Sequence, residues 1–188
     1  SFKLFTERLP EDGTMIINTD IDDYKYFFSE SSCEVITVGS SSETSMYSPA
    51  DITFDDSGCC SYKLVVNNEA SFNSSFTDSE SNGAVVNLSV PGIHNVYNSL
   101  AAIAVARKLG ISTDTIIAGL NKFTGTDRRF QKKGSFNGIT VVDDYAHHPD
   151  EISATLESTR HFEHNRVWCV FQPHTYSRTK ALMKEFAQ

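Results

Sequence analysis

The sequence predicts an α/β protein built in two parts, and three observations lead to this fold class. Short apolar runs alternate with helix-like segments near both ends of the 188-residue chain, a pattern typical of strands joined by helices. Between them, residues 39–90 are rich in Ser, Asn and Asp and contain brief apolar alternations, which favour an antiparallel meander. Residues 124–127 look like a joint. We therefore expect one domain over residues 1–127 and a second, with an incomplete parallel sheet, over residues 128–188.

The first part should open with a helix, because residues 1–9 place Phe2, Leu4, Phe5 and Leu9 near helical spacing. Apolar runs then predict strands at residues 14–18 and 34–38, with a short helix at 24–29 between them. The Ser-rich stretch could instead be a disordered linker, but its regular apolar alternation favours the meander. Its expected strands are residues 50–54, 61–66, 71–77 and 84–90.

Two helices should follow the meander, over residues 93–110 and 115–123. Gly110 supplies the stop of the first, and the Ser-Thr-Asp run at 112–114 starts the second. The expected order after the joint is strand 139–143, helix 150–161, strand 167–171 and helix 179–186. A sheet this short is incomplete, and the chain has no start methionine. We therefore expect a piece of a longer protein.

Charge is distributed unevenly along the chain, whose formal net value is −8. Residues 1–92 carry 4 basic and 15 acidic side chains, whereas residues 93–188 carry 12 basic and 9 acidic ones and all six histidines. The acidic excess argues against a protein that coats nucleic acid. No apolar run reaches the roughly 20 residues of a membrane span. We expect a soluble, cytoplasmic protein with an anion-binding site in its second half. Its four cysteines have no zinc or redox spacing and are expected to be ordinary thiols.

The most informative polar residues are Asp143, Asp144, His147 and His148, which follow the apolar run 139–142. Open α/β sheets bind ligands beyond the carboxyl ends of their strands, and Pro149 suits the first turn of a helix. On such a loop, amide N–H groups and imidazoles could bind phosphate, and a carboxylate could accept ribose hydroxyls. One alternative is a cluster of caps and turns. Another is a Zn²⁺ or Mn²⁺ site of a metal-dependent hydrolase.

Three other groups of polar residues could join this site. His174 and Arg178 follow the next expected strand, and a guanidinium is a good donor to phosphate or carboxylate. Asn95 and Asn98 are spaced i, i+3 at the start of a helix, so both amides can face one ligand; the alternative for Asn95 is a helix cap. Arg129 lies at the joint, where it could reach a phosphate or form a surface ion pair.

A phosphate-binding P-loop is missing from the printed sequence. It contains no G-x-x-x-x-G-K-S/T motif, and no Gly-rich turn follows a strand. Any nucleotide must therefore be gripped partly by residues outside these 188.

Four motifs, taken together and in this order, resemble those of the Mur ligase family. They are residues 92–102 (Gly-Ile-His-Asn-Val-Tyr-Asn-Ser-Leu-Ala-Ala), 123–130 (Phe-Thr-Gly-Thr-Asp-Arg-Arg-Phe), 143–149 (Asp-Asp-Tyr-Ala-His-His-Pro) and 171–179 (Phe-Gln-Pro-His-Thr-Tyr-Ser-Arg-Thr). The resemblance covers almost the whole chain, except the Ser-rich meander. It implies that residues 1–127 end a central ATPase domain and that residues 128–188 begin a Rossmann-like C-terminal domain.

The resemblance also implies an activity in bacterial peptidoglycan precursor synthesis. Members phosphorylate a muramoyl carboxylate with ATP and Mg²⁺ and then join an amino acid, here L-alanine, to UDP-N-acetylmuramate. By motif match, the nucleotide contacts would be His94, Asn95, Asn98, Arg129 and Asp144, with Arg129 catalytic; the UDP-sugar contacts would be Tyr145, His147, His174 and Arg178. Thr175 stands where some members have arginine, so fewer cationic contacts to the substrate phosphates are expected.

The family's P-loop and main Mg²⁺ ligands would lie upstream, so no metal ligand is expected in this chain, and the chain alone is expected to be inactive. A module that only binds nucleotide remains an alternative. No nucleic-acid or membrane partner is expected. An exposed sheet edge would offer a surface for self-association.

Overall fold

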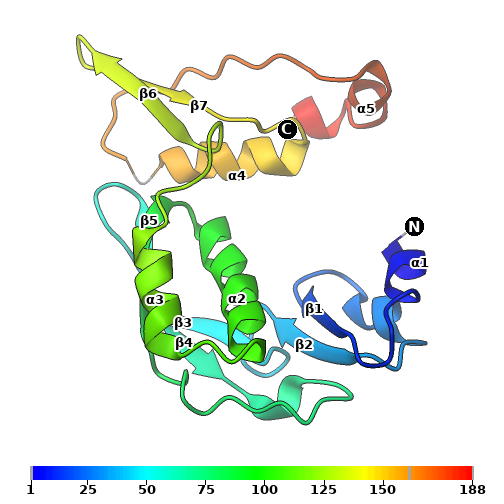
Figure 1. The fold of residues 1–188 in the computed structure, drawn as a ribbon. Helices are drawn as coiled ribbons and strands as arrows, with labels where there is room; N and C mark the ends of the chain where they lie inside the picture. The colour runs from blue at the N-terminus through cyan, green and yellow to red at the C-terminus, as the bar shows by residue number, and fades with distance from the viewer. Residues whose placement is uncertain (1, 161, 188) are drawn as a thin grey trace.

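The computed structural model describes residues 2–160 and 162–187 and has two parts joined by one extended segment (Figure 1). The first part is a five-stranded sheet with two helices against it. Its elements are α1 (Phe2–Thr6), β1 (Thr14–Asn18), the 3-10 turn η1 (Tyr24–Phe28), β2 (Glu34–Val38), β3 (Tyr47–Phe54), β4 (Cys59–Val66), the 3-10 turn η2 (Asn68–Ala70), β5 (Val85–Pro91), α2 (Ile93–Lys108) and α3 (Thr113–Lys122). The second part holds β6 (Gln131–Phe136), β7 (Ile139–Asp143), α4 (Pro149–Thr159), α5 (Tyr176–Ala181) and the 3-10 turn η3 (Glu185–Ala187).

The sheet of the first part is mixed, and its strand order is β1-β2-β3-β4-β5. β1 and β2 are parallel over their whole length, β2 meets β3 in parallel at Val38 and Tyr47, and β3, β4 and β5 are antiparallel neighbours. The expected meander is therefore confirmed for three of its strands. The meander β3-β4-β5 is continuous with the parallel pair β1-β2, so the five strands form one sheet.

The expected strand at residues 71–77 is wrong. Phe72 makes one isolated antiparallel bridge with Val35, and the rest of the segment is irregular. β3 reaches β2 only at Val38, which leaves the start of β2 open on that side for Phe72 to pair. Phe72 also packs on Phe28, with ring centroids 5.0 Å apart. The segment thus closes a small second core under β1 and β2.

The main core lies between α2 and the sheet. α2 buries Val96, Leu100, Ile103 and Ala104 in a cluster that includes buried residues from β2 to β5. Burying one such aliphatic side chain contributes about 1.5–3 kcal/mol. This burial explains why the alanine-rich helix expected at residues 93–110 forms. None of the helices built by the described residues is long and apolar enough to cross a membrane.

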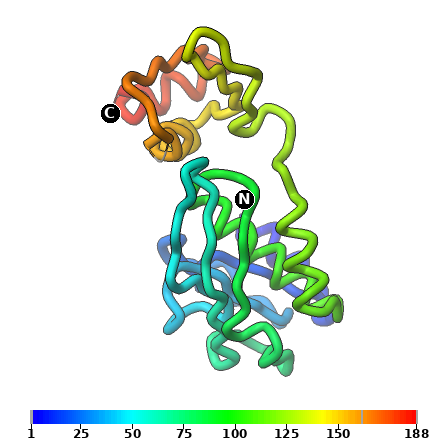
Figure 2. The backbone as a smooth tube through the Cα atoms, turned by 90° about the vertical axis from the view of Figure 1, so that its left-hand side faces the viewer, coloured from blue at the N-terminus to red at the C-terminus, as the bar shows by residue number. Residues whose placement is uncertain are grey.

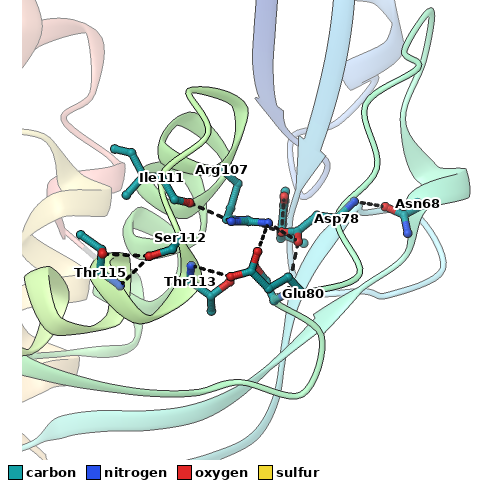
Figure 3. A network of polar contacts seen from close by, with 10 residues as sticks. Asn68, Asp78, Glu80, Arg107, Ile111, Ser112, Thr113 and Thr115 are labelled. Carbon is teal, nitrogen blue, oxygen red and sulfur yellow. Dashed lines mark hydrogen bonds and ion pairs between the residues drawn. The ribbon is translucent and has the colours of Figure 1, made fainter.

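A polar network fastens the loop between β4 and β5 to the helices (Figure 3). The carboxylate of Asp78 is buried and accepts two bonds of 3.0 Å from the guanidinium of Arg107 on α2. It also accepts a bond of 2.9 Å from the Tyr47 hydroxyl. Glu80 adds a 3.0 Å contact to Arg107 and accepts the backbone N–H of Thr113 at the start of α3. The Ser-rich stretch is therefore anchored rather than a free linker.

The second part departs from the expected parallel sheet. β7 has the predicted bounds, but it pairs antiparallel with β6 through a two-residue turn, Asn137-Gly138, whose φ values are 48° and 78°. The expected strand at residues 167–171 is wrong, because this segment is irregular and Val170 is fully exposed. A buried strand of a parallel sheet needs neighbouring strands, and the described residues of this part place no strand beside residues 167–171. β7 therefore satisfies its hydrogen bonds in the hairpin.

The two parts touch where β5 turns into α2. Figure 2 shows this turn and the β3–β4 hairpin tip lying beneath α4, with the connecting segment at one side. Gly92 at the turn has a φ of +96°, and an ideal Cβ built on it would lie 2.5 Å from the Oγ of buried Ser158 on α4. Only glycine fits this close approach. The joint predicted at residues 124–127 lies on the connecting segment, outside any helix or strand.

Candidate functional site

The first two turns of α2 hold three of the predicted nucleotide contacts. The N-cap of α2 is Gly92, so the alternative in which Asn95 caps the helix is wrong. The Asn95 side chain instead donates to the Pro91 carbonyl at 2.8 Å, and the Asn98 amide donates to the Asn95 Oδ1 at 3.2 Å. The two amides thus lie side by side, as their spacing predicts, and Asn98 is exposed to solvent.

His94 connects the two parts electrostatically. Burial lowers the pKa of His94, the carboxylate of Asp144 opposes this shift, and the guanidinium of Arg129 adds to it. Its Nδ1 atom is buried and has no hydrogen-bond partner among the described residues. His94, Asp144 and Arg129 come from three separate motifs of the sequence. The structure therefore brings these three predicted residues together at the joint.

Asp144 is held by backbone N–H groups on both sides. Its Oδ2 accepts the N–H of Phe130 and its Oδ1 accepts the N–H of Ala146, each at 2.7 Å. The neighbouring Tyr145 donates its own N–H to the carbonyl of Arg128 at 2.6 Å, and the Arg128 guanidinium lies 4.6 Å from the centre of the Tyr145 ring. The loop after β7 is therefore bound directly to the residues that follow the joint.

Glu151 on α4 organises the histidines of the same loop. Its Oε2 accepts the backbone N–H of His147 at 3.0 Å and that of His148 at 3.2 Å, and these contacts complete a capping box with His148 as the N-cap. The bond from His147 lowers the pKa of Glu151, burial opposes this, and the bond from His148 and the charges of His147 and Arg129 lower it further. Arg129 lies 3.6 Å from Glu151 and keeps 52% of its side chain exposed.

The cap-and-turn interpretation therefore holds for part of this loop. The Nδ1 of His147 lies 2.9 Å from the Tyr145 carbonyl, and Asp143 pairs with Lys133 at 3.5 Å. Within residues 2–160 and 162–187, no group of three or more His, Cys, Asp or Glu side chains could hold a metal ion. The hydrolase alternative thus finds no ligand set here, and a Mg²⁺ ion would find no group of three such side chains among the described residues.

The residues present fit a nucleotide better. Asn98 and Arg129 offer exposed polar groups on the two sides of the joint, and the buried Nδ1 of His94 has no hydrogen-bond partner among the described residues. A neighbouring pocket of about 340 Å³ is lined by Ile93 at the start of α2 and by the α4 residues Asp150, Ser153, Ala154, Glu157 and Ser158. These groups would hold only part of a nucleotide.

His174 and Arg178, the two predicted site residues of the fourth motif, make no contact with the cluster of His94, Arg129 and Asp144 that an interaction in the described residues records. His174 is exposed, and the Nη1 of Arg178 on α5 is buried without a hydrogen-bond partner among the described residues. No hydrogen bond or ion pair in the described part of the chain joins either residue to the loop after β7. The structure thus brings together the motifs around α2, the joint and β7, but not the fourth.

Three contributors were missed in the sequence. The Arg128 guanidinium lies over the Tyr145 ring, and Glu151 accepts the backbone N–H of His147. The Ser158 hydroxyl lies close to Gly92. Glu151 has a recognisable signal, because an acid three residues after a helix N-cap is the mark of a capping box. Arg128 and Ser158 have no such signal, since each contacts a residue that is distant along the chain.

Comparison with known proteins assigns the family. Residues 1–106 match the family model described as the Mur ligase middle domain, and residues 128–188 match the model described as Mur ligase, glutamate ligase domain. The first match alone covers more than half of the chain. The chain belongs to the Mur ligase family.

Curated relatives carry the same name. The chain is 60% identical over 187 residues to the UDP-N-acetylmuramate–L-alanine ligase of Lachnospira eligens and 40% identical over 188 residues to that of Acetivibrio thermocellus. Both alignments cover all of this chain and 38% of the relative. The chain therefore spans little more than a third of the length of these relatives.

Solved structures show the same fold. UDP-N-acetylmuramate–alanine ligase MurC from Thermotoga maritima matches with a TM-score of 0.64 and 25% identity, over 96% of this chain and 45% of that one. A murein peptide ligase from Psychrobacter arcticus matches with a TM-score of 0.64 and 28% identity, over 93% of this chain and 34% of that one.

Proposed function

We propose that this chain supplies one side of the nucleotide site and the joint of an ATP-dependent ligase that joins L-alanine to UDP-N-acetylmuramate in peptidoglycan precursor synthesis. The observation that carries the proposal is the 60% identity to the Lachnospira eligens ligase over 187 residues. The convergence of His94, Arg129 and Asp144 at the joint supports it. The proposed reaction uses ATP and Mg²⁺, with the main metal ligands outside these 188 residues.

In the proposed reaction, a carboxylate oxygen of UDP-N-acetylmuramate attacks the γ-phosphorus of ATP, which releases ADP and leaves an acyl phosphate. The amine of L-alanine then attacks the acyl carbon, phosphate departs, and the amine loses a proton. Both steps gather negative charge, so a cation held at the joint lowers their barriers. Arg129 is the proposed cation, since its guanidinium is half exposed and is held near Glu151.

The remaining contacts follow the motifs. We assign His94, Asn95, Asn98 and Asp144 to ATP and Tyr145, His147, His174 and Arg178 to the UDP-sugar. We also place the domain boundary after Asp127, with residues 128–188 beginning the Rossmann-like C-terminal domain. The two family matches, which end at residue 106 and begin at residue 128, support this boundary.

The test of the function uses the natural full-length polypeptide. With ATP, Mg²⁺ and UDP-N-acetylmuramate, we expect ADP release that depends on L-alanine. Release that is independent of L-alanine, or absent, would contradict the proposal. The 188-residue polypeptide by itself should release no ADP, because the printed sequence holds no P-loop.

The residue assignments can be tested by NMR. Addition of millimolar ATP to the full-length polypeptide should shift the amide resonances of Asn98 and Asp144. The matched control is Asn121, an exposed residue of α3 that is not assigned to ATP. Unchanged resonances at Asn98 and Asp144 in an otherwise active protein would remove these assignments while leaving the reaction intact.

A further inference from the structure

The residues after the joint adopt a backbone conformation that their side chains disfavour. Arg128 has a φ of 63° and Phe130 a φ of 45°, so both lie in the left-handed region that is natural for glycine. Neither residue has the short polar side chain that eases this conformation. Such a geometry persists only where surrounding contacts impose it. Arg129, the proposed cation, lies between the two.

Asp144 and Tyr145 supply two of these contacts. The Oδ2 of Asp144 accepts the N–H of Phe130 at 2.7 Å, and the N–H of Tyr145 donates to the carbonyl of Arg128 at 2.6 Å. Each of the two left-handed residues therefore has a backbone group fixed by a hydrogen bond, the N–H of Phe130 and the carbonyl of Arg128. The Oδ1 of Asp144 accepts the N–H of Ala146 at 2.7 Å, which fixes the carboxylate itself.

We propose that Asp144 is a positioning residue for Arg129: by accepting the N–H of Phe130, its carboxylate holds the left-handed backbone that flanks Arg129 and so aims the Arg129 guanidinium. The proposal rests on the function proposed above and goes beyond a contact between Asp144 and the ribose. A carboxylate has about four acceptor positions and the two N–H groups use two, so both roles are compatible. The two roles nevertheless predict different kinetics.

The decisive experiment compares Asp144→Asn with the unchanged full-length enzyme, using ATP and 2′,3′-dideoxy-ATP. If Asp144 positions Arg129, kcat should fall about 10- to 100-fold with either nucleotide, as expected for loss of a hydrogen bond to a charged group. If Asp144 serves only the ribose, the defect should disappear with the dideoxy nucleotide, which has no hydroxyls to lose. That result would overturn the proposal.

Hydrogen exchange provides a readout that does not depend on activity. Without nucleotide, the amide of Phe130 should exchange at least several-fold faster in Asp144→Asn than in the unchanged protein, and unchanged exchange would overturn the proposal. Asp143→Asn is the matched control, because Asp143 precedes Asp144, pairs with Lys133 and touches no amide of residues 128–130. It should leave both the exchange and the kcat unaltered.

A second variant separates positioning from loss of folding. Phe130→Gly tolerates the left-handed backbone without help, so adding it to Asp144→Asn should restore part of the lost kcat. Failure of this rescue with an intact fold, judged by circular dichroism, would count against the positioning role. If the unchanged enzyme itself has no L-alanine-dependent ADP release, the proposed function fails, whereas the exchange result still decides what Asp144 does to the backbone.

Discussion

Arg107 and Asp78 meet in a two-point ion pair, Nε to Oδ2 and Nη2 to Oδ1, each at 3.0 Å, with the carboxylate fully buried (Figure 3). Burial raises the pKa of Asp78, but bonds from Arg107, Ser81 and Tyr47 outweigh this and hold it below its usual value. The planar fork of arginine suits such a contact. The pair joins the Ser-rich loop to α2.

Removing Asp78 should therefore destabilise the fold strongly. Asp78→Ala leaves the mostly buried Arg107 with Glu80 as its ion-pair partner and removes the two-point contact to Asp78. It also leaves the buried Tyr47 hydroxyl without its acceptor, and we expect a total loss of about 3–5 kcal/mol in the free energy of unfolding. Urea unfolding followed by fluorescence measures it. Glu157→Ala is the control, since the Glu157–Arg160 pair is exposed and should change stability by less than about 0.5 kcal/mol. Equal effects in both variants would contradict a stabilising role for the Asp78 pair.

His94 should make stability depend on pH near neutrality. Its pKa in the folded protein is lowered, chiefly by burial, so the unfolded chain, with a histidine pKa of about 6.5, binds the proton more readily. Stability should be complete above about pH 6.5 and should be lost as the pH falls through the folded pKa. We expect His94→Gln to reduce the change of the urea unfolding midpoint between about pH 8 and about pH 5. Exposed His164→Gln is the control and should keep the slope of the unchanged protein.

Gly92 should tolerate no side chain. Gly92→Ala puts an alanine at a φ of +96° and brings its Cβ within 3.0 Å of the Ser158 hydroxyl and of the His94 ring. Gly110→Ala, at a φ of +79°, meets nothing within 4 Å. We expect Gly110→Ala to cost about 1–2 kcal/mol of stability through the backbone alone and Gly92→Ala to cost more. Thermal unfolding compares the two. Ser158→Ala removes the clashing hydroxyl and should recover part of the difference; no recovery would mean that α4 does not rest on Gly92.

The cysteines should differ widely in reactivity. Cys169 is exposed, whereas burial, together with the neighbouring Cys59 and Asp55, raises the pKa of Cys60 to about 11. Thiolates are the reactive form, so iodoacetamide at mildly alkaline pH should label Cys169 rapidly and Cys60 only after denaturation. Peptide mapping by mass spectrometry reads the order of labelling. Rapid labelling of native Cys60 would contradict the buried position of Cys60 on β4.

Strands that are continuous apolar runs were predictable to the residue. β1, β2 and β7 have the expected bounds, because each run is short, β-branched and bounded by turn residues. The hairpin partner of β7 was missed, since β6 contains only one apolar side chain, that of Phe136. The Asn137-Gly138 pair was an available signal, because this dipeptide favours the two-residue turn that is observed. The segment 167–171 misled for the opposite reason: its apolar run resembles a buried strand, but no described strand lies beside it.

The motifs select the members of the candidate site, whose binding roles stay predictions, but the motifs do not give the contacts among these residues. Motif matching selected His94, Arg129 and Asp144, and the structure brings them together. That Asp144 binds the N–H of Phe130 could not be read from the sequence, because a backbone donor carries no residue signature. A contact between residues that are distant along the chain becomes visible only in the three-dimensional structure.

The strand order of the central sheet has a consequence for how the protein is made. Each strand from β2 to β5 pairs with the strand that precedes it in the chain. During synthesis, each strand from β2 to β5 therefore meets a partner that has already left the ribosome, and none of these four described strands is inserted between two earlier ones. Because such neighbouring pairings close short loops, we expect the sheet to assemble stepwise while translation continues.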